Sequence, residues 1–116
     1  MGITDLTVAA LGTDTVRNNS YIYIGNMLFC FGITYIQSIE KSTSSNLTIT
    51  LPKSFSDTNY FVLATKYHNS EGTDLDKVDV FPIEKSTVNQ FIVRMVNNSS
   101  AKREIRISWM AIGKKA

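Results

Sequence analysis

Two side chains in this sequence have the chemistry for nucleophilic catalysis, the thiol of Cys30 and the imidazole of His68, and each is the only one of its kind. A cysteine activated by a nearby histidine is a common enzyme nucleophile. Cys30, however, stands between Phe29 and Phe31, and free cysteines are usually buried. The sequence has no Gly-x-Ser-x-Gly elbow and no glycine-rich phosphate loop. We therefore interpret Cys30 as a core residue and His68 as a loop residue, and predict no catalytic residues, no cofactor and no enzymatic activity.

A second possibility is metal binding by Asp74, Asp76 and Asp79, which stand close together in a polar stretch. Carboxylate oxygens at such a spacing can bind calcium. The stretch does not fit the EF-hand pattern, because the third acid is offset by one residue and the required glycine and final glutamate are missing. We interpret it as a solvated acidic turn and predict no metal site.

Sugar recognition is a third possibility. It uses flat amphipathic aromatic side chains surrounded by carboxylate, amide and guanidinium groups. The candidate ligand-binding residues with this chemistry are Tyr67, His68, Asn69, Asp79 and Arg94. The alternative for the tyrosines of this chain is that they fill a core or a subunit interface.

Arg94 is the most informative of these residues. It stands between Val93 and Met95 in an alternating segment, so we expect it on the opposite face, the side of Ile92. An arginine inside a strand can pair across an interface or extend into solvent.

Strands must position these residues, because the apolar pattern has a period of two almost everywhere. Leu47, Ile49 and Leu51 share one face of a segment that Pro52 ends. Near the end of the chain the same pattern puts four residues on one face, which we assign to the core or an interface: Ile105, Ile107, Trp109 and Ala111.

Other strands follow from turn signals. Gly25-Asn26 between two apolar runs predicts a two-residue hairpin, and Gly32 suggests a bulge or a close backbone approach. Residues 60–67 are so rich in apolar side chains that we expect them to be buried on both faces or covered by a partner. We also expect a short strand at residues 78–81 that Pro82 ends, and polar loops at 41–45, 68–73, 84–87 and 97–101. These elements predict an all-β sandwich or barrel of about seven strands.

Length and composition agree with a single folded domain. The chain has 116 residues, of which 43% are hydrophobic and 19% charged. A net charge of +2 is too small to indicate nucleic-acid binding. The start of the chain lacks the basic and apolar regions of a signal peptide, and no apolar run reaches the ~20 residues of a membrane span. We therefore expect synthesis in a cytoplasm without a signal peptide, no membrane insertion and no nucleic-acid partner.

Three segments together resemble the C-terminal receptor-binding (tip) domains of phage tail fibres. They are the hairpin at 21–32, the strand, proline and phenylalanine at 47–55 with the returning strand from Asn59, and the ending Trp-Met-Ala-Ile-Gly at 109–113. Those fibre domains are similar in turn to H-type lectins. This chain departs from the fibre pattern at Phe31, where a tryptophan usually precedes the glycine.

The resemblance implies an antiparallel β-sandwich of about six to seven strands, H-type lectin-like, at residues 21–116, with residues 1–20 as an N-terminal linker or stalk end. It also implies a homotrimer at the tip of the tail fibre in a virion, joined to the rest of the tail fibre and binding a bacterial cell-surface glycan or other receptor. Two alternatives remain: a structural trimerising cap of the fibre without specific ligand binding, and a fibre-borne depolymerase. We disfavour the depolymerase because such enzymes need carboxylate pairs on long parallel solenoids.

Overall fold

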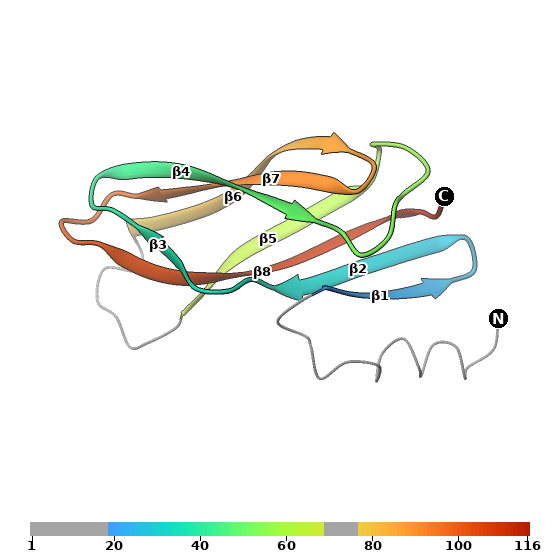
Figure 1. Ribbon diagram of the computed structural model, residues 1–116, viewed down its shortest axis with the longest axis horizontal. Helices are drawn as coiled ribbons and strands as arrows, with labels where there is room; N and C mark the ends of the chain where they lie inside the picture. The colour runs from blue at the N-terminus through green and yellow to red at the C-terminus, as the bar shows by residue number, and fades with distance from the viewer. Residues whose placement is uncertain (1–18, 69–76) are drawn as a thin grey trace.

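The computed structural model describes residues 19–68 and 77–116 and shows eight strands there (Figure 1). Their bounds are β1 (Asn19–Ile24), β2 (Met27–Ile33), β3 (Gln37–Ile39), β4 (Thr43–Thr50), β5 (Phe61–His68), β6 (Val78–Thr87), β7 (Gln90–Asn97) and β8 (Arg103–Lys114). None of the described residues forms a helix of the length and apolarity needed to cross a membrane.

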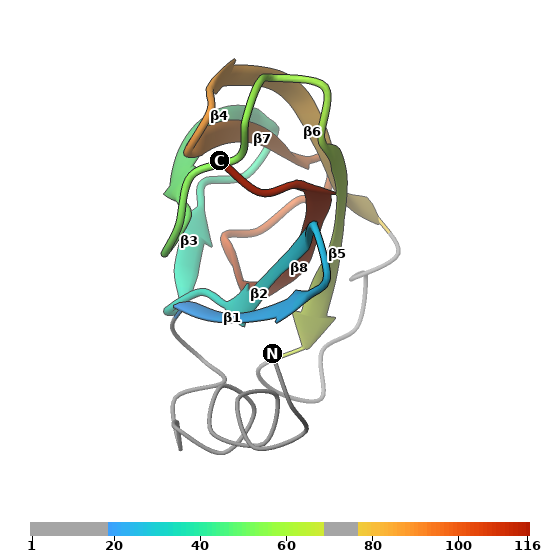
Figure 2. The ribbon, with the colours of Figure 1, turned by 90° about the vertical axis from the view of Figure 1, so that its right-hand side faces the viewer.

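The strands form two antiparallel sheets. In the five-stranded sheet, β8 pairs with β2 and β3 along one edge and with β5 along the other, and β1 extends the sheet beyond β2. The three-stranded sheet has the order β4-β7-β6. Figure 2 shows the two sheets as layers that face each other. The predicted all-β antiparallel sandwich is confirmed.

The core lies between the inner faces of the two sheets, where the period-two pattern placed it. Trp109 is 5% exposed and meets the ring of Phe91, from the opposite sheet, edge to face at 5.7 Å between centroids. Ile105, Ile107 and Ala111 are fully buried beside it. The assignment of the Trp109 face to the core is therefore correct.

The predicted hairpin at Gly25-Asn26 is confirmed. Ile24 and Met27 pair directly across the two-residue loop, and Gly25 has φ of 60°. A positive φ at the first loop position is typical of a type II′ turn, which glycine favours. The register continues through Gly32 without a bulge and places this glycine opposite Trp109.

Pro82 does not end its strand, so this expectation was wrong. β6 runs from Val78 to Thr87, through Pro82 and the segment 84–87 that we expected to be a loop. β6 is an edge strand, and a proline there removes no interior hydrogen bond. Its register is irregular around Glu84. The expected loop at 41–45 is likewise shorter, because β4 already begins at Thr43.

Candidate functional site

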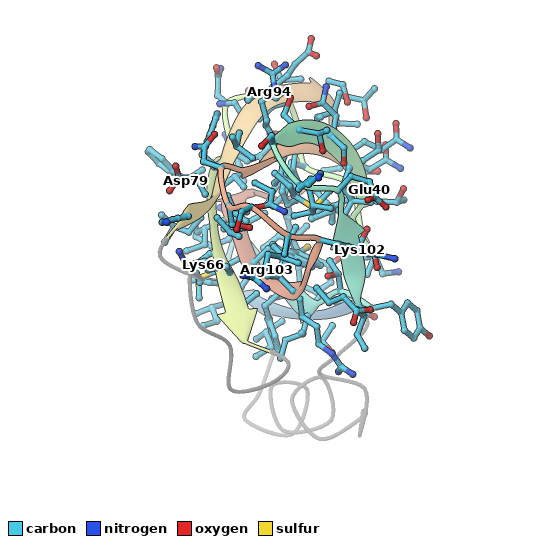
Figure 3. All side chains as sticks on the ribbon, turned by 90° about the vertical axis from the view of Figure 1, so that its left-hand side faces the viewer. Glu40, Lys66, Asp79, Arg94, Lys102 and Arg103 are labelled. Carbon is cyan, nitrogen blue, oxygen red and sulfur yellow. The ribbon has the colours of Figure 1, made fainter. Side chains whose placement is uncertain are left out.

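One end of the sandwich gathers the connections that follow β3 and β7 together with the last residues of β5 (Figures 1 and 3). β3 ends there at Ile39 and β4 begins at Thr43, while β7 ends at Asn97 and β8 begins at Arg103. β5 ends at the same place and β6 begins beside it. We call this region the loop end.

The buried side chain of Asn97 holds the loops of the loop end together by hydrogen bonds. Its side chain is fully buried, and Nδ2 donates hydrogen bonds to the carbonyl oxygens of Ile39 and Ala101 at 2.9 Å and lies 3.2 Å from that of Glu40. Its Oδ1 accepts a hydrogen bond from the backbone N–H of Ser99 at 2.9 Å. One buried amide therefore ties the 40–42 turn to the 98–102 loop.

Asn97 was not among the predicted site residues, because the whole segment 97–101 was expected to be a loop. The signal was nevertheless present. Phe91, Val93 and Met95 face the core, and Asn97 is the next inward position of the same strand. A polar residue at a buried position must find hydrogen-bond partners, and the adjacent loops supply them here.

Two lysines connect the sheets where β5 and β6 lie side by side. Lys66 Nζ on β5 donates to the carbonyl oxygen of Val78 on β6 at 2.6 Å. Lys85 Nζ on β6 donates to the carbonyl oxygen of Tyr60 at 3.0 Å and lies 5.7 Å from the centroid of its ring. Because β5 and β6 belong to different sheets, these bonds close one side of the sandwich.

A groove of about 320 Å³ lies between β5 and β6. Its lining includes the exposed ring of Phe61 together with Glu84 and Lys85. These residues were not among the predicted site residues, because Pro82 was expected to end the strand that carries Glu84 and Lys85.

The structure brings several of the predicted ligand-binding residues to the loop end. Tyr67 and His68 are the last two residues of β5, where their backbone pairs with Arg106 and Ile105. Asp79 is the exposed second residue of the adjacent β6. Asn69 lies outside the described residues.

Arg94 lies on the outer face of the three-stranded sheet, the side of Ile92, as expected. Its side chain is exposed, and Nε donates to Oδ1 of Asn46 on β4 at 3.1 Å. Asp79 lies on the same face, on the neighbouring strand. It is a diagonal neighbour of Arg94, because Asp79 pairs with Val96 and Arg94 pairs with Phe81. Figure 3 shows Arg94 on the outer side of the sandwich, at the top of the view, and Asp79 at its left-hand side.

The β4 side of Arg94 is rich in polar groups, whereas its neighbours on the same face of β7 and β6 are Ile92, Val96 and Phe81. The exposed side chains of β4 on this face are Ser44, Asn46, Thr48 and Thr50. Gln90 Nε2 donates to Thr50 Oγ1 at 3.3 Å. Hydroxyl, amide and guanidinium groups on one flat surface can donate to and accept from the hydroxyls of a sugar. We call this surface, with Arg94 and Asp79, the polar face.

The structure excludes a catalytic pair of Cys30 and His68. Cys30 is fully buried, and this burial raises the pKa of its thiol to about 12, which keeps it protonated near neutral pH. On β8, Cys30 pairs with Ala111 and His68 with Ile105. Six residues of strand separate these positions, which is about 20 Å at ~3.3 Å per residue.

The acidic turn is only partly visible. Asp74 and Asp76 lie outside the described residues, and Asp79 is the one acid of the three that the structure places. Residues 19–68 and 77–116 contain no group of three or more His, Cys, Asp or Glu side chains arranged to hold a metal.

The tyrosines divide between core and surface. Tyr60 is 1% exposed, and Tyr21 and Tyr23 pack against the core from β1. Tyr35, between β2 and β3, is 64% exposed. The core interpretation therefore holds for three of these four residues.

Comparison with known proteins places these features in a family. The family model described as "putative tail fiber protein gp53-like, C-terminal" matches residues 28–114. A search of curated proteins gave no match.

Two solved structures share the fold. An N-truncated R1-type pyocin tail fiber superposes with a TM-score of 0.58 at 12% identity, over 92% of this chain and 93% of that chain. A P. aeruginosa R1 pyocin fiber fragment superposes with a TM-score of 0.57 at 13% identity, over 75% of this chain. The match spans 23% of that fragment.

Proposed function

Because the chain belongs to the gp53-like C-terminal family of tail fiber proteins, we propose that it is the part of a phage tail fibre that binds a receptor on the host surface. A tail fibre protein is a component of the virion. The receptor in this proposal is a bacterial cell-surface glycan, bound without catalysis by three copies of the chain. Residues 1–20 lead into the sandwich as a linker or stalk end, with Asn19 and Ser20 already paired in β1.

The observation that carries the glycan proposal is the chemistry around Arg94. Its guanidinium is exposed and already oriented by Asn46, with the hydroxyl side chains of β4 on one side and the apolar side chains of Ile92, Val96 and Phe81 on the others. Arginine presents several N–H donors in a fixed plane, which suits pairs of sugar oxygens. Asp79 adds an acceptor on the same face, and the backbone places Tyr67 and His68 at the adjacent strand end.

Three linked copies of the chain can compensate for the weak affinity of each single sugar site. A single exposed sugar site of this kind binds weakly, because each hydrogen bond replaces one with water. Linked sites raise the effective concentration of the second and third contacts, and avidity can exceed single-site affinity by ~10²–10⁴. A homotrimer therefore supports lectin-like adhesion to a surface that displays many copies of one glycan.

An array of purified bacterial capsule and O-antigen polysaccharides tests this proposal. The labelled 116-residue chain should bind some spots, and the same soluble polysaccharide should compete. Arg94→Ala and Asp79→Ala should each lower binding about tenfold or more. Lys102→Ala is the control for lost charge, because Lys102 is exposed on the other side of the loop end (Figure 3).

The rival function, a trimerising cap without a ligand, makes the opposite prediction. A cap would bind no spot on the array, and Arg94→Ala would behave as the wild type does. If polysaccharide binding survives both Arg94→Ala and Asp79→Ala, the ligand-binding site does not lie on the polar face.

A further inference from the structure

Rows of apolar side chains cross the outer face of the five-stranded sheet, next to polar residues that include Thr65, Ser108 and Arg106. Residues directly opposite each other in a sheet share a face. The register therefore aligns one row across four strands, from β1 to β5: Ile22, Phe29, Ile112 and Phe61. A second row joins Phe31, Met110 and Leu63 across β2, β8 and β5. We call these rows, with Ile24 and Met27, the apolar face.

Much of the apolar face is open to solvent in the single chain. Phe61 is 77% exposed, Leu63 66%, Ile24 50% and Met110 39%. A groove of about 370 Å³ lies on the same surface, with Leu63, Ser108 and Met110 among its lining residues. Large exposed apolar patches mark interaction sites in soluble proteins. The outer face of the other sheet is more mixed, because β4 adds serines, threonines and Asn46 there while β6 and β7 add Phe81, Ile92 and Val96.

Exposure on the apolar face is highest at its two opposite edges. Phe61 and Leu63 lie on β5, and Ile24 lies in the β1–β2 hairpin at the far side of the sheet. Contacts in a cyclic ring of three copies are heterologous, so that each chain uses two different patches. Two exposed patches at opposite edges of one sheet fit this requirement.

The charge distribution also fits a second copy of the chain. Near a symmetry axis a residue meets its own copies, and like charges there repel. The second row, formed by Phe31, Met110 and Leu63, carries no charge. The basic residues of this face, Arg106 and Lys114, stand toward the two ends of β8 instead.

We propose that the apolar face packs against copies of this chain around a threefold axis, with the β5 patch of one chain, Phe61 and Leu63, against the β1–β2 patch of the next, Ile24 and Met27. This inference rests on the homotrimer of the proposed function and identifies its interface. It leaves the polar face outward on all three chains, free to contact a host surface.

Solution mass by light scattering on the 116-residue chain tests the interface. The wild type should have a mass of about 39 kDa, which is three chains of 13.0 kDa. Leu63→Glu and Ile24→Glu each place a charge in one patch and should give monomers. Thr48→Glu, a matched change at an exposed position of the polar face, should remain trimeric.

Mixing the two single-patch variants tests the heterologous geometry. Leu63→Glu retains an intact β1–β2 patch and Ile24→Glu an intact β5 patch. One of each should therefore join into a dimer of about 26 kDa, since each chain has a mass of 13.0 kDa. A mixture that stays monomeric would overturn the pairing of these two patches. Circular dichroism verifies that both variants are folded, as expected for exposed positions.

Peroxide oxidation of Met27 and Met110 measures whether the face is covered. Both should be protected in the wild type and oxidised in Leu63→Glu. A trimeric Leu63→Glu would overturn this interface and leave the homotrimer intact. A monomeric wild type would overturn both the interface and the homotrimer. This holds whether its methionines are oxidised or are protected by another part of its own chain. The polysaccharide array tests receptor binding separately in each case.

Discussion

Gly113 lies directly beneath Tyr60, so closely that a Cβ atom on Gly113 would be 2.7 Å from Tyr60 Cβ. The same atom would be 2.8 Å from Cδ1 of Phe55, whose ring stacks on that of Tyr60 with 4.4 Å between centroids. The glycine that ends the Trp-Met-Ala-Ile-Gly segment is therefore a packing requirement, because β8 passes under this aromatic pair.

Gly113→Ala should destabilise the protein by about 1–3 kcal/mol, the usual cost of overpacking a filled core. Urea unfolding at one fixed protein concentration measures the change, since assembly makes stability depend on concentration. Thr48→Ala is the control, because Thr48 is exposed on the outer face of β4 and its truncation leaves the core unchanged. Equal stability of Gly113→Ala and wild type would contradict the close approach.

Asn97→Ala should cost about 2–4 kcal/mol, because it leaves several buried backbone groups at the loop end without partners. Amide hydrogen exchange should rise in the 40–42 turn and the 98–102 loop before it rises elsewhere. Asn98→Ala, at the exposed neighbouring position, should change stability by less than about 0.5 kcal/mol. If both variants lose the same stability, the buried network is not the cause.

Stability should fall as pH rises from about 9 to about 12. Burial raises the pKa of Cys30 from 9.0 to about 12, and burial also raises the pKa of Tyr60 from 10.0 to about 12. The folded protein therefore retains protons that the unfolded chain releases, so alkaline pH favours unfolding. Urea midpoints at pH 8 to 11 measure the slope, which should be shallower in Cys30→Ala. A native thiol that reacts readily with iodoacetamide at pH 9 would contradict the raised pKa.

Arg94→Ala should leave stability within about 0.5 kcal/mol of the wild type, because the side chain is exposed and makes one hydrogen bond to Asn46. Thermal unfolding measures this. Loss of polysaccharide binding without loss of stability would then reflect the binding surface itself. A large destabilisation would instead make Arg94 a structural residue.

The sequence predicted the elements whose pattern is local. Alternation at residues 105–111 identified the buried face of β8, and Gly25-Asn26 identified a hairpin, because period and turn geometry depend on near neighbours. Pro82 misled the prediction, since a proline ends a central strand but is tolerated in an edge strand. The position of β6 at an edge depends on its pairing with β7, which the local sequence does not encode.

The candidate site was less predictable for the same reason. Nothing in the sequence brings Asp79 beside Arg94, because the register of β6 on β7 does so. The dense apolar segment 60–67 predicted burial on both faces or a partner. In the structure Val62 and Ala64 pack against the core while Phe61 and Leu63 are exposed. Composition indicated the second apolar face, but only topology shows that it continues across β8, β2 and β1.

The position of β8 also affects how the domain bears a load. β8 is hydrogen-bonded along both edges, to β2 and β3 on one side and to β5 on the other. Tension along its length would therefore shear many backbone hydrogen bonds at once instead of opening them one at a time. A fibre pulled between a particle and a bound cell would carry that force best along this strand.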